Sequence, residues 1–203
     1  MMDKKITRSE IKRAAVISAA ITEFRAKGFK TASMDDIAKR ADVSKRTVYN
    51  HFPSKEALFG AIMQEMMSML CALESVPYSA DASLKSQLTL LANHEIALLK
   101  AEGFIATSKV IIAEAIHSPE LIEEAMLQLS KQESPMANWF ESAIEAGVIK
   151  ANSPEMLVTQ FLAVIKAFCF WPQLIQNAPF PDDAKTAEVV DTAVEMIIKQ
   201  YAV

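Results

Sequence analysis

Residues 24–59 read FRAKGFKTASMDDIAKRADVSKRTVYNHFPSKEALF, and this stretch decides the fold expected for the chain. It contains two short helical segments, at about residues 33–41 and 45–51, and each begins at or directly after a serine that can cap it. Only Asp42, Val43 and the second capping serine separate them, so the turn is tight. Two short helices joined in this way are typical of a helix-turn-helix unit that binds DNA.

The flanking sequence predicts a longer helix on each side of this pair. Thr7 and Glu10 have the spacing of a capping box, and apolar residues recur on one face after them. A helix is therefore expected at about residues 7–27, ended by Gly28 in a left-handed conformation. A fourth helix is expected from Pro53 and Ser54 to about residue 73, because apolar residues recur there at helical spacing.

The whole chain has the composition of an all-α protein. Its 203 residues are 51% apolar but include only four glycines and eight prolines, too few for the turns of a sheet protein. Ser118, Ser134 and Ser153 each precede a proline, which is a strong signal for the start of a helix. The last two helices are expected at about residues 154–177 and 183–201.

Charge is distributed unevenly along the chain. Residues 1–60 hold 13 basic and 7 acidic residues, whereas residues 61–203 hold 8 basic and 18 acidic residues. The formal net charge of -4 therefore combines a basic N-terminal part with an acidic remainder. Such a distribution indicates a polyanionic partner for the N-terminal part, although a solvated basic face without a partner has the same composition.

The second short helix carries the side chains that a DNA-contacting helix needs. Its N-terminal end would face base edges in the major groove, where cationic and amide groups can read donor and acceptor patterns. The candidates for base contact are Lys45, Arg46, Thr47 and Asn50. The candidates for phosphate contact are Ser44, Tyr49, His51 and Lys55. The alternative for Tyr49 and His51 is that they only pack one helix against the next.

This stretch resembles the DNA-binding domain of the TetR/AcrR transcriptional regulators, with GF, IA, TVYNHF and SKEAL at the spacings of that family. The main departure is Asp42, where the family usually has glycine; aspartate tolerates the left-handed conformation of a tight turn. The resemblance implies a homodimeric, ligand-responsive regulator, most often a repressor, that binds a palindromic operator. It also implies DNA contact by residues 1–53, effector binding and dimerisation by residues 54–203, and a dimer interface formed by the last two helices.

Residues 111–125, IIAEAIHSPELIEEA, resemble the C-terminal domain of the AefR-like subgroup of these regulators. The methionine and aromatic content of this part favours an apolar or aromatic effector. The candidates for its pocket are Met66, His94, His117, Trp139 and Phe168. Each has an alternative role, since methionines and aromatic residues at helical spacing also form cores and dimer interfaces, and the histidines can be hydrogen-bonded core residues or solvated.

No catalytic or metal-binding pattern is recognisable in the sequence, so we expect neither an enzyme nor a bound cofactor or metal. Glu114 and His117 form half of a di-iron motif, but no second such pair exists. A small-molecule carrier that uses its N-terminal helices for docking is the alternative to a regulator. The charged N-terminus and the absence of a long apolar run indicate a cytoplasmic protein without a membrane span.

Overall fold

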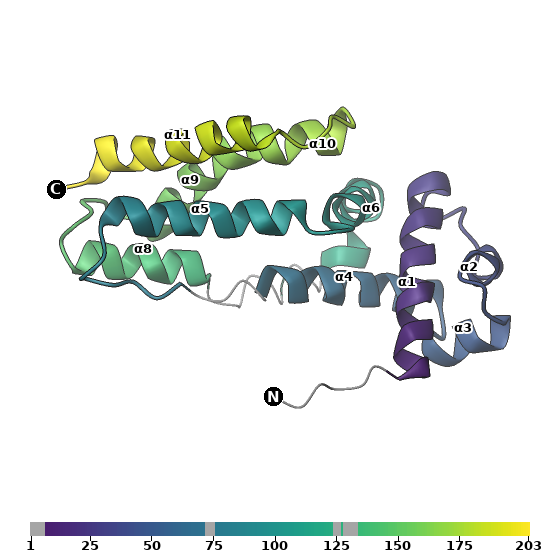
Figure 1. The fold of residues 1–203 in the computed structure, drawn as a ribbon. Helices are drawn as coiled ribbons and strands as arrows, with labels where there is room; N and C mark the ends of the chain where they lie inside the picture. Colours follow the sequence, from purple (N-terminus) through teal and green to yellow (C-terminus); the bar gives the residue numbers. More distant parts are fainter. Residues whose placement is uncertain (1–6, 72–75, 124–126, 128–133) are drawn as a thin grey trace. The chain divides into compact units, whose positions relative to one another are not determined.

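A computed structural model describes residues 7–71, 76–123, 127 and 134–203, and the predicted all-α fold is confirmed (Figure 1). The named helices are α1 (Arg8–Lys27), α2 (Met34–Arg40), α3 (Lys45–His51), α4 (Lys55–Cys71), α5 (Leu84–Lys100), α6 (Phe104–His117), α8 (Pro135–Glu145), α9 (Pro154–Cys169), α10 (Trp171–Ile175) and α11 (Asp183–Tyr201). Over these ranges no strand forms, apart from one isolated bridge between Ile149 and Ala202. None of the described helices is long and apolar enough to cross a membrane.

The chain divides into two compact units. The N-terminal unit comprises the described residues within 1–68 and 106–129, and the C-terminal unit comprises those within 69–105 and 130–203. Most of α6 therefore belongs with the helix-turn-helix segment, although it is distant from that segment in sequence. The boundary predicted after residue 53 separates the residues expected to contact DNA from those expected to bind the effector. That functional division stays a prediction.

Side-chain caps set the starts of the first three helices. At α1 the capping box is complete: the Thr7 hydroxyl accepts the Glu10 N–H at 3.2 Å, and the Glu10 carboxylate accepts the Thr7 N–H at 2.7 Å. Ser33 and Ser44 each accept the backbone N–H three residues further on, both at 3.1 Å. The helices predicted from these residues are confirmed, because a cap depends only on neighbouring sequence.

The turn between α2 and α3 depends on a left-handed residue. Asp42 has φ of +52°, as predicted, and its N–H donates to the carbonyl of Lys39 at 3.2 Å. The next N–H, that of Val43, donates to the carbonyl of Ala38 at 3.1 Å. Asp42 therefore ends α2 and directs the chain into α3 in the role that glycine usually has at the end of a helix.

Replacing Asp42 by glycine is expected to leave stability unchanged or to raise it by up to about 1 kcal/mol, because glycine adopts positive φ without steric cost. Replacing it by valine is expected to cost about 1–2 kcal/mol, since a β-branched residue is strained there. Urea unfolding of both variants measures the difference. A glycine variant that is less stable than wild type would show that the Asp42 side chain itself stabilises the turn.

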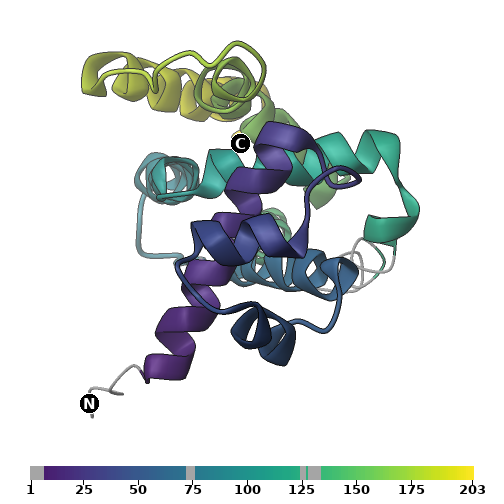
Figure 2. The same ribbon diagram turned by 90° about the vertical axis from the view of Figure 1, so that its right-hand side faces the viewer.

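Aromatic rings form the centre of the N-terminal unit. The ring of Phe29 lies 5.2 Å from that of Phe24 in α1 and 5.4 Å from that of Phe59 in α4, measured between centroids. Ile37 of α2 and Val48 of α3 are fully buried. Both helices pack against α1 (Figure 2). These apolar contacts fix the angle between α2 and α3, and so they fix the direction in which α3 presents its outer face.

The C-terminal unit is a helical bundle in which α5, α8 and α11 pack against α9. Its core contains a chain of edge-to-face rings, with Trp139 at 5.2 Å from Phe140 and Phe140 at 6.0 Å from Phe161. All three side chains are at most 2% exposed. Apolar faces of the kind predicted from the sequence therefore meet in one core.

The prediction of one helix at residues 154–177 was wrong. The structure has α9, which ends at Cys169, and then the five-residue α10, because Phe170 leaves the helical conformation with φ of −134° and ψ of −60°. Pro172 accounts for the break, since its ring would clash with the carbonyl of Phe168 and it has no N–H to donate. The side-chain amide of Gln173 donates to the Phe168 carbonyl at 3.2 Å instead. The predicted helix at 183–201 is confirmed as α11.

Candidate nucleic-acid interface and ligand pocket

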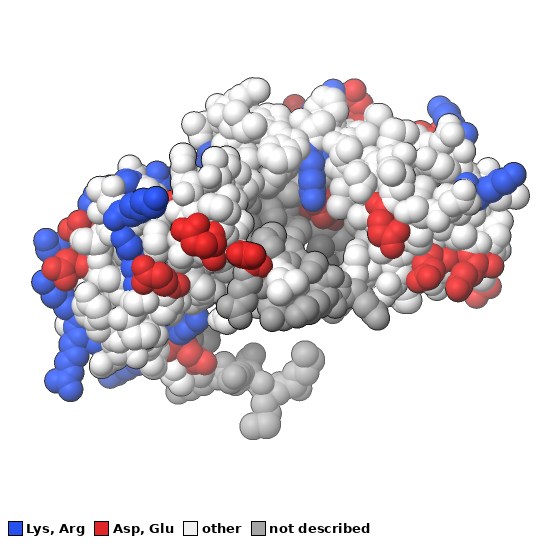
Figure 3. Space-filling view, turned by 180° about the vertical axis from the view of Figure 1, so that it is seen from behind, with Lys and Arg blue, Asp and Glu red and all other residues white. Residues whose placement is uncertain are grey.

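Helix α3 presents a polar outer face from a firmly held position. Val48 is fully buried, whereas Lys45, Arg46, Tyr49 and Asn50 are exposed, with Tyr49 at 49%. The exposed side chains occupy two successive turns of one face, as a helix lying in a groove requires. In Figure 3 the N-terminal unit, on the left, carries many of the blue Lys and Arg side chains.

The remaining predicted α3 residues also have structural roles. Ser44 caps the helix, and its hydroxyl lies 2.8 Å from the hydroxyl of Thr47. His51 is half-buried at the end of α3, with its ring 6.1 Å from that of Phe52. Contact of these three side chains with DNA stays a prediction.

Lys45 is held by an ion pair on the surface. Its ammonium lies 2.5 Å from a carboxylate oxygen of Asp35 in α2, and this hydrogen bond raises the pKa of Lys45. Both side chains remain about half exposed or more, at 63% and 46%. Exposed pairs of this kind contribute little to stability, because water and salt screen them. Lys45 can therefore exchange Asp35 for a base or a phosphate at small cost.

Lys55 lies in the first turn of α4, as predicted, but its ammonium already has partners inside the chain. It donates to the carbonyls of Lys30 at 2.9 Å and Ala32 at 3.1 Å, and it lies 4.8 Å from the centroid of the Phe29 ring. The structure thus gives Lys55 a role in holding the α1–α2 connection. Its contact with a phosphate stays a prediction.

Two buried carboxylates, whose roles were not predicted from the sequence, hold the N-terminal unit together. The Glu23 carboxylate of α1 accepts hydrogen bonds from the Arg40 guanidinium at 2.7 Å and the Lys27 ammonium at 2.8 Å. These hydrogen bonds lower the pKa of Glu23, and the one from Lys27 has the larger effect. Glu114 of α6 accepts the backbone N–H of Phe29 at 3.1 Å. Both side chains are largely buried, at 3% and 5% exposed. Their position on apolar helix faces was the available signal.

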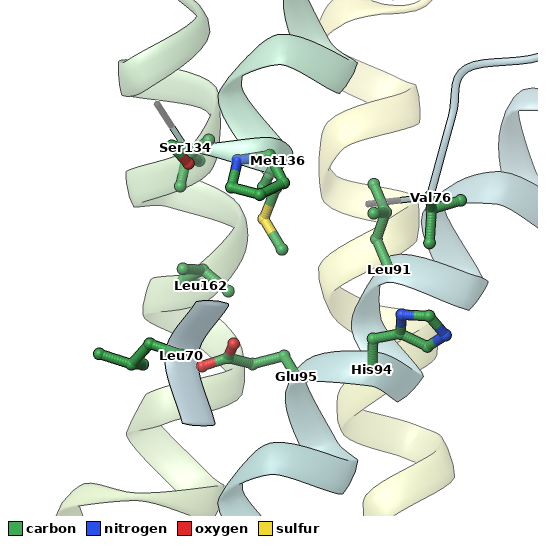
Figure 4. A pocket seen from close by; sticks show the side chains of 10 residues that line it. Leu70, Val76, Leu91, His94, Glu95, Ser134, Met136 and Leu162 are labelled. Atoms are coloured by element: carbon green, nitrogen blue, oxygen red, sulfur yellow. The ribbon is translucent and has the colours of Figure 1, made fainter. Parts of the chain in front are cut away.

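The C-terminal unit contains a pocket of about 140 Å³ between α4, α5, α8 and α9 (Figure 4). Most of its described lining is apolar: Leu70, Val76, Leu91, Pro135, Met136, Val158 and Leu162. Polar groups come from Ser134 and from two neighbouring residues of α5, His94 and Glu95. Pockets with an apolar lining and few polar groups are typical of small-molecule sites.

Glu95 is the buried charged group of this pocket. Its side chain is 6% exposed, and its carboxylate lies 3.6 Å from the ammonium of Lys166 in α9. Burial raises the pKa of Glu95, while Lys166 opposes the increase. The sequence held a signal for this residue, since Glu95 has helical spacing with Leu88, Leu91 and Leu99 on one apolar face.

The structure separates the five predicted pocket residues. His94 lines the pocket, and Trp139 lines a more open hollow beside Tyr78. Met66 is buried in the N-terminal unit, and His117 is exposed in α6. Phe168 is 44% exposed, with the Lys185 ammonium 5.1 Å above its ring. Of the five residues chosen from sequence, Met66 and Trp139 are buried, whereas His117 and Phe168 are exposed, so sequence periodicity did not assign them to one cavity.

Glu114 and His117 do not form half of a metal site in the structure, because Glu114 is buried and His117 is exposed. Within the described ranges, no cluster of three or more His, Cys, Asp or Glu side chains could hold a metal ion.

The capped α3 with its exposed polar face, joined to a second helical unit that contains a pocket, has the organisation of a helix-turn-helix transcriptional regulator. Comparison with known protein families supports this class. Residues 16–62 match the family described as bacterial regulatory proteins, tetR family, and residues 86–203 match the AefR-like transcriptional repressor, C-terminal domain. The chain belongs to the TetR family of DNA-binding transcriptional regulators, and its residues 86–203 match the AefR-like C-terminal domain.

Known relatives share most of the chain. A TetR family transcriptional regulator from Pseudomonas syringae pv. tomato str. DC3000 is 35% identical, with a TM-score of 0.83 over 95% of this chain and 97% of that one. A TetR-family regulator from Mesorhizobium loti MAFF303099 is 28% identical, with a TM-score of 0.77 over 98% and 100%. The HTH-type transcriptional regulator YhgD of Bacillus subtilis (strain 168) is 28% identical over 76% of this chain and 81% of its own length. All three of these relatives are named as transcriptional regulators.

Proposed function

We propose that this protein is a ligand-responsive repressor that binds a palindromic operator as a homodimer and leaves it when an effector occupies the C-terminal unit. One observation carries the proposal: α3 is capped at Ser44 and anchored by the buried Val48, and it exposes Lys45, Arg46 and Asn50 together. These side chains can donate to base edges in a major groove. On this proposal residues 1–53 contact DNA, and residues 54–203 bind the effector and dimerise.

The proposed dimer uses the C-terminal helices. Large apolar side chains are exposed on α9, α10 and α11, namely Met156, Phe168, Trp171, Ile175 and Met196. Exposed large apolar side chains on these helices favour burial against a protein partner, and the same helices of a second copy would satisfy two-fold symmetry. The dimer would place its two α3 helices about 34–36 Å apart, which is one turn of DNA.

The proposed effector site is the pocket beside Glu95, and its lining favours an apolar or aromatic effector. An effector that binds one conformation of the body more tightly shifts the population toward it. A tenfold loss of operator affinity requires about 1.4 kcal/mol of such coupling. Because the proposed operator lies on bacterial DNA, the protein would act in the cytoplasm.

The test is selection of bound sequences from random duplex DNA, followed by a screen of metabolites for release of the selected operator. A palindromic consensus with salt-dependent affinity supports the proposal. A small-molecule carrier, the alternative function, would select no sequence and would show no salt-dependent binding at physiological ionic strength. The position of the operator relative to a promoter then distinguishes a repressor from an activator.

Single substitutions distinguish base contacts from phosphate contacts. Asn50→Ala is expected to lower the preference for the selected operator over mutated sites about tenfold, because an amide contact to a base is lost. Lys55→Ala is expected to weaken binding to all sequences alike and to lower the slope of log K against log salt by about one unit. Fluorescence anisotropy over a salt series measures both effects. An unchanged slope for the Lys55 variant would restrict Lys55 to its internal hydrogen bonds.

A further inference from the structure

The pocket of the C-terminal unit has a chemical character of its own, and this further inference rests on the proposed function because it concerns the same effector site. We infer that the pocket binds an uncharged molecule with an apolar ring and a hydroxyl group, and that the hydroxyl donates a hydrogen bond to Glu95. The size of the pocket, the contacts of Glu95 and the balance of charge each support one part of this inference.

The size and lining of the pocket fit one ring. Its volume is about 140 Å³, and seven of its described lining residues are apolar. An apolar cavity of about 150 Å³ in another protein holds benzene. Met136 reaches into this space from α8 in Figure 4, and its flexible thioether can adapt to the shape and the face of a ring. The pocket therefore fits a ligand that contains a single aromatic or alicyclic ring.

The Glu95 carboxylate can accept more hydrogen bonds than its contacts within the chain provide. In Figure 4 its carboxylate points toward Leu70 and Leu162, which are apolar and offer no hydrogen bond. The Lys166 ammonium lies 3.6 Å away, beyond an ordinary hydrogen-bond length. An ionised carboxylate has about four acceptor positions, and a protonated one still keeps acceptor capacity. A buried group of this kind gains from a ligand that donates to it.

The charges around the pocket favour a neutral donor over an ionic one. Lys166 balances the charge of Glu95, so a cationic ligand would add a second positive charge beside Lys166. An anionic ligand would lie beside the buried carboxylate of Glu95, and like charges in a poorly solvated site repel strongly. His94 also lines the pocket, and in Figure 4 its ring points toward Val76, away from the Glu95 carboxylate. A hydroxyl group satisfies Glu95 without disturbing this balance.

The experiment measures binding of four ring compounds to the full chain, without DNA: phenol, toluene, benzylamine and benzoate. Titration calorimetry or NMR titration gives each dissociation constant for the wild type and for three variants, Glu95→Gln, Glu95→Leu and Glu141→Leu. The last is a matched control, because Glu141 is an exposed carboxylate in α8 of the same unit. We expect the wild type and the Glu141 variant to bind phenol at least tenfold more tightly than toluene, benzylamine or benzoate.

The Glu95 variants are expected to lose this preference. Glu95→Leu should bind phenol and toluene about equally, and Glu95→Gln, which keeps the shape and a weaker acceptor, should show an intermediate preference. Should the leucine variant not fold, the glutamine variant alone decides the test. Tightest binding of benzylamine or benzoate, equal binding of phenol and toluene by the wild type, an unchanged phenol preference in the Glu95 variants, or binding of none of the four would overturn the inference. Because the assay contains no DNA, failure of operator binding is detected separately.

Discussion

Replacing Phe168 and Ile175 together by aspartate is expected to convert the proposed dimer into monomers and to lower operator affinity by about 10²–10⁴. Both side chains are exposed in the single chain, at 44% and 71%, so the substitutions need not disturb its core. In a dimer they would place four carboxylates in an apolar interface, where unpaired charge is strongly unfavourable. The affinity falls because the second α3 would no longer bind as part of the same molecule. Sedimentation velocity and anisotropy with the selected operator measure the two effects.

The matched control for this prediction is Leu90→Asp. Leu90 is also 44% exposed and apolar, but it lies on α5, outside the proposed interface. This variant should remain dimeric and bind the operator as the wild type does. A double variant of Phe168 and Ile175 that stays dimeric, or that binds the operator with full affinity as a monomer, would contradict a dimer interface on α9 and α10.

The parts of the fold that were predicted from sequence depend on local chemistry. Thr7, Ser33, Ser44, Ser134 and Ser153 each accept a backbone N–H in the first turn of the helix that follows. Capping needs only residues within one turn, so sequence spacing is sufficient to recognise it. The exposed face of α3 was also predicted from local sequence, because the helical period places Val48 on the opposite side of the helix from its polar neighbours.

Other features depend on residues that meet only in the folded chain. Glu95 pairs with Lys166, and Glu114 with Phe29, over 71 and 85 positions of sequence. No local pattern identifies such partners, so the sequence indicated an acidic residue on an apolar face without showing what compensates its burial. The pocket has the same origin, since four helices contribute to its lining. Of the predicted pocket residues, His94 alone belongs to its described lining.

The pairing of Glu114 with Phe29 leads to the second large effect, on the stability of the N-terminal unit. Gly28 ends α1 with φ of +77°, and Phe29 follows with its ring in the aromatic core. The Phe29 N–H is therefore buried just where the chain leaves α1, and the Glu114 carboxylate accepts it at 3.1 Å. Lys55 holds the next part of the same connection through the carbonyls of Lys30 and Ala32. Helices α4 and α6 thus both fix the segment that leads to α2.

Glu114→Ala is expected to lower the free energy of unfolding by about 2–3 kcal/mol, because it leaves the buried N–H of Phe29 without its acceptor. Glu114→Gln should be neutral or stabilising. Its amide oxygen can still accept this N–H, and it removes the charge from a carboxylate whose second oxygen has no hydrogen-bond partner among the described residues. Urea unfolding measures the stability, and hydrogen exchange of residues 28–32 reports whether the connection loosens.

Glu120→Ala is the control for these two variants, since Glu120 is an exposed acid close to Glu114 in sequence and should change stability by less than about 0.5 kcal/mol. The contrast between alanine and glutamine at position 114 separates two explanations. If glutamine destabilises as much as alanine, then the negative charge, and not the acceptor for Phe29, is what the fold requires. If exchange at residues 28–32 rises only in the alanine variant, then the hydrogen bond from Phe29 connects α6 to the segment that orients α2 and α3.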